Sequence, residues 1–202
     1  MVNAEYYIGN MEREVTWSID EESITEGEDR LQAVQFLAIP GTVKIKEATI
    51  NAIEGKIVVQ REGNGVELET FLQSKGPLAE IEVSAMVLQI AAALSHAESY
   101  VLPSQNLYPP DLSPQSVFVQ DGLFLFDLFS PNNDQSAYWR AVKALAVLGV
   151  YAGCGGRVSS QEVREDLGGH LASLHWGPRL STMLLDMFYS KTFPSFSCLP
   201  LA

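Results

Sequence analysis

Cysteine, histidine and basic residues are all scarce in this chain of 202 residues. The two cysteines, Cys154 and Cys198, are too few for a disulfide framework or a structural zinc site, which favours a reducing intracellular compartment. The three histidines, His96, His170 and His175, do not follow the spacing of metal ligands. We therefore expect no metal and no cofactor.

Lysine and arginine number 13 against 25 aspartates and glutamates, so the formal net charge is −12. Nucleic acids and anionic membranes are polyanions, and this charge argues against both as main partners. The most apolar stretch, residues 144–155, is about half the length needed to cross a bilayer. Residues 1–10 show no signal-peptide pattern. We expect a cytoplasmic or otherwise intracellular protein without membrane insertion.

A cluster of carboxylates stands near the N-terminus. Residues 20–29 contain six of them, here called the acidic strip: Asp20, Glu21, Glu22, Glu26, Glu28 and Asp29. Like charges at this density repel one another and favour an extended, solvated chain. The strip is therefore either a flexible loop or an electrostatic docking segment for a basic stretch of a protein partner.

The remaining chain has a globular composition, with 47% hydrophobic residues. Alternation predicts a half-buried strand over residues 42–50, in which Lys44 and Lys46 face solvent, and an antiparallel partner over 56–60. A weak strand is expected within 4–19, around Tyr6, Tyr7 and Ile8, and a short helix over 31–39. Apolar residues around Asp121-Gly122 predict a tight hairpin of strands 117–120 and 123–126.

Helical periodicity appears in five segments, at residues 66–74, 80–98, 139–151, 159–167 and 180–189. Val66 and Leu68 are expected to face the core from the first segment. The helix over 139–151 is apolar nearly all round, which is typical of a helix in the middle of a core. Trp139 and Trp176 are expected to be core anchors, and Ser159 or Ser160 a helix cap.

Three motifs in this order resemble those of a protein kinase. Asp111-Leu112-Ser113-Pro114-Gln115-Ser116 is similar to the kinase catalytic loop, and Asp127-Leu128-Phe129 stands where the D-F-G motif follows a hairpin. Thr192-Phe193-Pro194-Ser195 is similar to a signature near the kinase C-terminus.

This resemblance covers roughly residues 30–196 and implies an α+β fold, with a mainly helical C-lobe and a reduced N-lobe of few antiparallel strands. It implies an acidic N-terminal segment over 1–30, an N-lobe-like strand region over 31–65 and a C-lobe-like region over 66–202.

The chain departs from the kinase pattern where kinases perform chemistry. Pro109-Pro110 replaces the His-Arg pair of the catalytic loop, Ser116 replaces the metal-binding Asn, and Phe129 replaces the Gly of D-F-G. The chain has no G-x-G-x-x-G loop. Only about ten residues separate Asp127 from the predicted central helix, too few for an activation segment. Asp111, Ser116, Asp127 and Phe129 are thus interpreted as degenerate kinase positions rather than catalytic residues.

A retained C-lobe with a reduced N-lobe is similar to the non-catalytic kinase C-lobe domains called KIND modules and to other pseudokinases. The resemblance implies a protein-binding scaffold or regulator, with the acidic strip as the candidate contact for a basic partner segment. Two alternatives stay open. One is a divergent kinase or nucleotide binder that uses Asp111, Asp127 and a lysine such as Lys46. The other is an acidic adaptor or chaperone unrelated to kinases.

Overall fold

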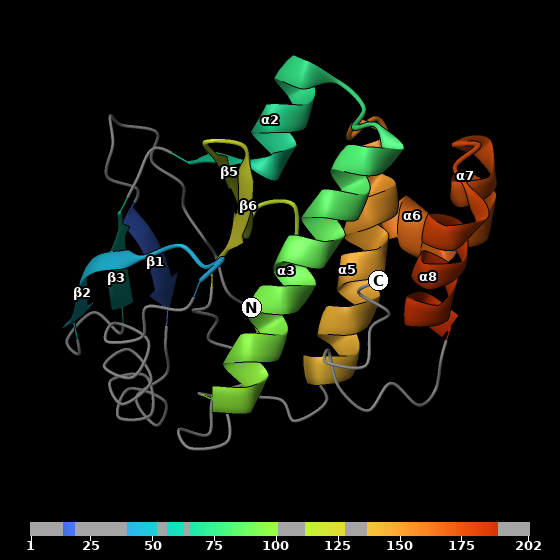
Figure 1. Cartoon of the computed structure of the whole chain (residues 1–202). Coiled ribbons are helices and arrows are strands. Elements are labelled where there is room, and N and C mark those ends of the chain that lie inside the picture. The colour runs from blue at the N-terminus through green and yellow to red at the C-terminus, as the bar shows by residue number, and fades with distance from the viewer. Residues whose placement is uncertain are drawn as a thin grey trace.

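The computed structural model describes residues 14–18, 40–51, 56–62, 65–100, 112–127 and 137–189. Figure 1 shows two small sheets beside a group of helices, with the hairpin β5–β6 between the first sheet and the long helix α3. The helix predicted over 31–39, the acidic strip and the motif at 192–195 lie outside the described residues.

The first sheet consists of β1 (Glu14–Ser18), β2 (Ile45–Asn51) and β3 (Lys56–Arg61), in the antiparallel order β1-β3-β2. The predicted antiparallel pairing of β2 with β3 is confirmed, with Ile50 opposite Ile57. β1 lies at the end of the range in which a strand was expected. Lys44 and Lys46 are exposed, as the alternation predicted.

The second sheet has the order β4-β5-β6, from β4 (Val66–Glu67), β5 (Val117–Gln120) and β6 (Leu123–Phe126). The predicted hairpin is confirmed, and its turn residues Asp121 and Gly122 have φ angles of 51° and 78°. Positive φ at both positions matches the turn to the twist of the flanking strands. The prediction for Val66 was wrong: it is a strand residue paired with Val119, 39% exposed, and not part of a helix that faces the core.

The helices are α2 (Leu68–Lys75), α3 (Glu80–Tyr100), α5 (Ala137–Gly153), α6 (Ser160–Glu165), α7 (Leu167–Ser173) and α8 (Pro178–Tyr189). Ser159 caps α6 in a capping box with Glu162, as expected at this position. The predicted helix over 159–167 divides at Asp166, whose carboxylate accepts a hydrogen bond from the Gly169 N–H (2.9 Å) and so begins α7. No helix within the described ranges is both long and apolar enough to span a membrane.

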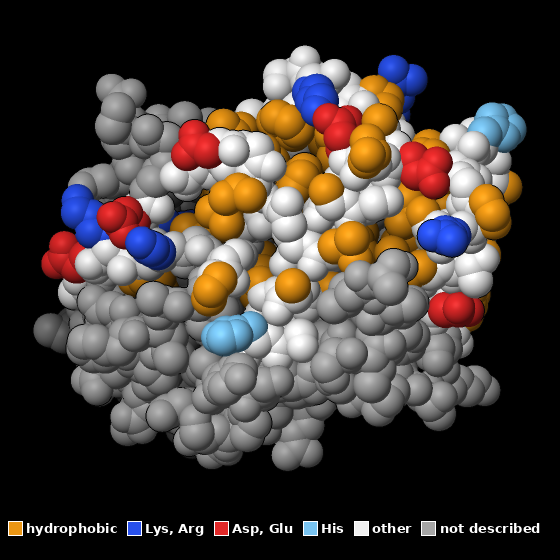
Figure 2. Space-filling model, in the orientation of Figure 1, with side chains coloured by type: hydrophobic (Ala, Val, Ile, Leu, Met, Phe, Trp, Pro, Cys, Tyr) orange, Lys and Arg blue, Asp and Glu red, His pale blue; other side chains and the backbone are white. Residues whose placement is uncertain are grey.

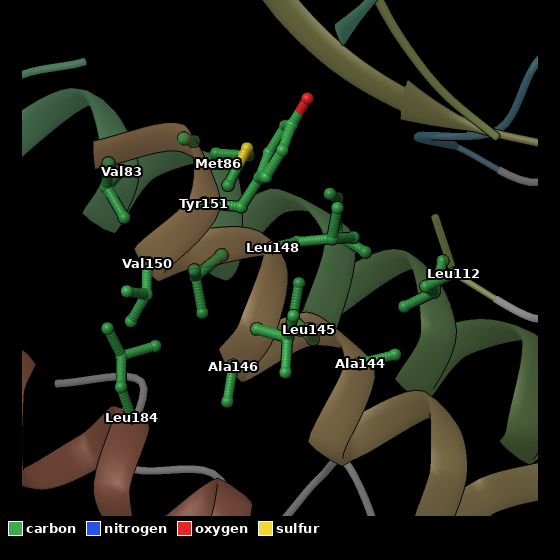
Figure 3. Close-up of a cluster of buried hydrophobic side chains, with 14 of the residues drawn as sticks. Val83, Met86, Leu112, Ala144, Leu145, Ala146, Leu148, Val150, Tyr151 and Leu184 are labelled. Atoms are coloured by element: carbon green, nitrogen blue, oxygen red, sulfur yellow. The ribbon is translucent and has the colours of Figure 1, made fainter. Parts of the chain in front are cut away.

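Helix α5 lies at the centre of the hydrophobic core, between α3 and α8, and Figure 3 shows the cluster around it. The residues predicted to form the apolar face of α3 are all buried: Val83, Met86, Val87, Ile90, Ala91 and Leu94. Leu145, Leu148 and Val150 of α5 are 0–1% exposed, and Leu184 of α8 packs against them. Burial raises the pKa of the Tyr151 phenol, and the charge of Glu69 raises it further.

The helical core also supports the hairpin, because α3 packs against β6, the strand that ends just before Asp127.

Candidate functional site at Asp127

Asp127 immediately follows β6 and is only 3% exposed. Its backbone N–H donates a hydrogen bond to the Ser116 carbonyl oxygen (2.9 Å), just before the start of β5. The hairpin thereby brings Ser116 and Asp127 together, two residues that the sequence resemblance interprets as degenerate kinase positions. Phe126, the preceding residue, is fully buried and holds this end of β6 in the core.

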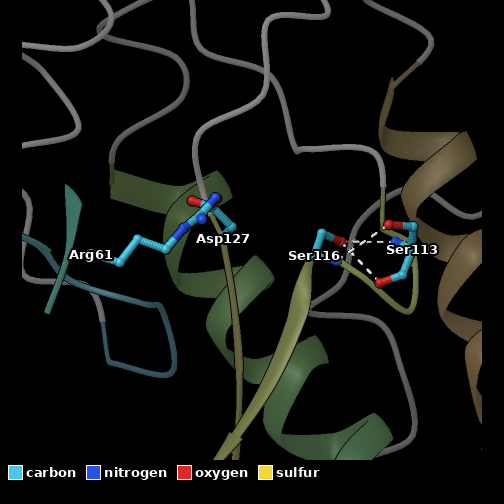
Figure 4. A network of polar contacts seen from close by, with 4 residues as sticks. All are labelled: Arg61, Ser113, Ser116 and Asp127. Carbon is cyan, nitrogen blue, oxygen red and sulfur yellow. Dashed lines mark hydrogen bonds and ion pairs between the residues drawn. The ribbon is translucent and has the colours of Figure 1, made fainter. Parts of the chain in front are cut away.

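The Asp127 carboxylate is bound by an arginine from the other sheet, as Figure 4 shows. Arg61 is the last residue of β3, and its Nε donates to Oδ2 of Asp127 at 3.0 Å. The Nη2 of Arg61 donates to the same oxygen. The two side chains are 10% and 5% exposed, so little water screens the pair. The guanidinium carbon also lies over the Phe118 ring, 5.3 Å from its centroid.

Ser116 closes a tight turn with Ser113. The Ser113 N–H donates to the Ser116 hydroxyl (2.8 Å), and that hydroxyl donates to the Ser113 carbonyl oxygen (3.1 Å). The Ser116 N–H also bonds to the Ser113 carbonyl oxygen (3.1 Å). The Ser116 hydroxyl therefore holds this turn together (Figure 4).

The structure brings Ser116 and Asp127 together, but Asp111, Phe129 and the acidic strip lie outside the described residues. Sequence reasoning did not find Arg61. Its only local signal is a basic residue at the end of a predicted strand, 66 positions before its partner.

Apart from the site at Asp127, a concave feature lies between α3 and β6 and has a volume of about 380 Å³. Its lining is mainly apolar and includes Ala92, Ala93, Leu123 and Phe124. The Gln89 side-chain oxygen accepts a hydrogen bond from the Phe124 N–H (2.9 Å) at its wall. Figure 2 shows hydrophobic side chains over α3 on this face of the molecule. Among the described residues that line the feature there is no carboxylate, and His96 of α3 is a titratable side chain there.

The order of the sheets, the hairpin and the central buried helix defines a protein-kinase-like fold. The chain is similar to the PAN3 pseudokinase of Drosophila melanogaster, with a TM-score of 0.71 and 14% identity over 99% of this chain. It is also similar to the PAN3 pseudokinase of Neurospora crassa (TM-score 0.67, 8% identity, 96% of this chain). A further match is Rad53 1-466 in complex with AMP-PNP (TM-score 0.67, 14% identity, 93% of this chain).

The chain spans 60%, 57% and 59% of the lengths of these three structures, respectively. No protein-family profile and no curated protein sequence matches it. The fold is therefore shared both with pseudokinases and with a protein that holds a nucleotide analogue. The fold alone does not decide whether this chain binds a nucleotide, so the residues of the site must be considered.

The kinase-like fold implies a metal-bound nucleotide, and the described residues do not fit one. In kinases the D-F-G Asp and the catalytic-loop Asn hold the magnesium ions. The sequence resemblance assigns these positions to Asp127 and Ser116; here the Asp127 carboxylate is bonded to a guanidinium, and the Ser116 hydroxyl is bonded within its own turn. A magnesium ion at Asp127 would meet the positive charge of Arg61. Within the described ranges, no group of three or more His, Cys, Asp or Glu side chains could hold a metal ion.

Proposed function

We propose that the chain is a catalytically inactive, kinase-like module that binds a protein partner through a basic segment of that partner. The observation that carries the non-catalytic part is the buried bond between Arg61 and Asp127. A metal-binding carboxylate must be available to the metal. This one is already neutralised by the chain itself.

The free energy needed to separate Arg61 from Asp127 supports the non-catalytic part of the proposal. Separating a buried ion pair so that one charge is left alone costs about 3–5 kcal/mol. A metal that displaced Arg61 from Asp127 would have to supply that free energy before it contributed to nucleotide binding. It would also have to leave the displaced guanidinium near a doubly charged cation.

The partner is proposed from charge. The net charge of −12 and the six carboxylates of the acidic strip favour encounter with a lysine- and arginine-rich segment. Such attraction raises the association rate and falls with ionic strength.

The partner proposal is tested with fluorescent peptides rich either in Lys and Arg or in Glu, titrated with the protein at low and high salt. The variant Glu21→Gln/Glu26→Gln/Glu28→Gln should lose most of the affinity for the basic peptide. The matched control replaces three exposed carboxylates elsewhere, Glu47, Glu165 and Asp186, by their amides and so has the same net charge. If both triple variants bind the basic peptide equally well, the acidic strip is not the contact.

Magnesium-dependent binding of ATP tests the non-catalytic part. A ligand at 100 times its Kd stabilises the folded state by about 2.7 kcal/mol. For a chain of this size, this corresponds to a rise in Tm of about 5–10 °C. We expect no rise with millimolar Mg²⁺ and ATP. A rise in Tm that disappears in Asp127→Asn would instead favour the divergent kinase or nucleotide binder. The lysine suggested for that alternative, Lys46, is an exposed residue of β2.

A further inference from the structure

The first sheet is joined to the hairpin at two points that converge on the end of β6. One is a pair of backbone hydrogen bonds, from the Val43 N–H to the Phe126 oxygen (2.9 Å) and from the Phe126 N–H to the Gly41 oxygen (3.2 Å). The other is the side chain of Arg61, which reaches the next residue, Asp127. The sheet therefore contacts the hairpin both where the chain enters β2 and where it leaves β3.

These two points belong to one closed unit. The Glu62 N–H donates to the Lys44 oxygen (2.8 Å), so the segment before β2 and the segment after β3 are bonded to each other. A movement of the sheet away from the hairpin would have to break the Arg61–Asp127 bond together with the two backbone bonds at Phe126. The ion pair of Arg61 with Asp127 is thus a long-range side-chain contact between the first sheet and the residue that follows the hairpin.

In kinases, bound metal ions and nucleotide phosphates occupy the cleft, and closure of the two lobes follows ligand binding. Here a cation of the chain itself is bound to the corresponding carboxylate. We propose that Arg61 is an internal cation that takes the position of the metal at Asp127 and fastens the first sheet to the hairpin without a nucleotide. This inference rests on the proposed non-catalytic function and deepens it, because it explains how the first sheet is held against the hairpin without a bound ligand.

Amide hydrogen exchange measures this fastening directly. In Arg61→Met, which keeps an unbranched apolar stem and removes the guanidinium and its charge, amides of β2 and β3 should exchange about tenfold faster or more. A tenfold change corresponds to about 1.4 kcal/mol in the opening equilibrium. Amides in the middle of α5 should exchange as in the wild type. The matched control is Lys75→Met, which removes an exposed pair with Glu82, and we expect it to leave exchange in β2 and β3 unchanged.

Arg61→Met removes the guanidinium from a buried carboxylate and could prevent folding. Arg61→Lys keeps the charge but loses the two-nitrogen contact, and it should accelerate exchange in the same strands by a smaller factor, about two- to fivefold. Unchanged exchange of β2 and β3 in the folded variants would overturn the role of Arg61.

Wild-type protein with Mg²⁺ and ATP gives the complementary result. We expect no added protection of the first sheet. Protection that appears only with both additives would overturn the non-catalytic function, whereas unchanged exchange in the Arg61 variants would overturn the fastening alone.

Discussion

Gly153, the last residue of α5, has a specific packing role that a single substitution can test. A Cβ at this position would lie within 3.0 Å of two atoms of the Trp176 ring and 2.9 Å from Cδ1 of Leu174. Trp176 packs against the core in the segment just before α8. The glycine therefore provides the space for the indole.

We expect Gly153→Ala to destabilise the fold. Forcing one methyl group into a packed site costs about 1–3 kcal/mol, and replacing glycine in a helix returns at most about 1 kcal/mol. The net loss should be about 1–2 kcal/mol, which lowers Tm by about 2–8 °C. Urea unfolding followed by circular dichroism measures the difference.

Gly168 of α7 provides the matched control, because a Cβ there would meet no atom within 4 Å. Gly168→Ala should be neutral or more stable by up to about 1 kcal/mol. In a Trp176→Leu background, the cost of Gly153→Ala should fall by about 1 kcal/mol, since the clashing ring is gone. If Gly153→Ala is as stable as Gly168→Ala, Trp176 is not the core anchor that the structure indicates.

Three further changes have defined outcomes. Leu145→Ala, at a position 0% exposed, should cost about 2–5 kcal/mol in chemical denaturation, whereas Ile81→Ala, at 78% exposure, should stay within about 0.5 kcal/mol. The hydrogen bond from Lys75, followed by that from the Ala79 N–H, lowers the pKa of Glu82, so its stabilising contribution is present above the unfolded pKa and is lost as pH falls through the folded pKa. In melting curves between pH 6 and 2, Lys75→Met should reduce that pH dependence, and an unchanged profile would contradict the assignment. Ser159→Ala removes the cap of α6 and should lower Tm by about 2–4 °C, with the loss of helicity confined to a small fraction of the circular dichroism signal.

The elements that sequence reasoning predicted well are those whose causes are local. Asp121-Gly122 between two apolar runs indicated the hairpin because few other residue pairs accept positive φ. The periodicity of α3 predicted its buried face residue by residue. The motifs around the hairpin indicated a kinase-like fold, which the structural matches confirm, whereas the kinase role of Asp127 stays a prediction.

The elements that it missed depend on contacts between distant residues. Val66 pairs with Val119, and that pairing takes the residue out of the helix that its neighbours form. Arg61 finds Asp127 only once both sheets are assembled, and no periodicity or motif reports such a contact. Helix α7 was missed for a local reason: its two adjacent glycines weaken the helical signal, although the side chain of Asp166 caps its start.

The most direct test of the account is transfer of labelled phosphate from ATP. Wild-type protein and Asp127→Asn would be incubated with γ-labelled ATP and Mg²⁺ or Mn²⁺, alone and with general acceptor proteins. The bond between Arg61 and Asp127 predicts no transfer by the wild type above the level of Asp127→Asn. Transfer by the wild type that Asp127→Asn abolishes would contradict it.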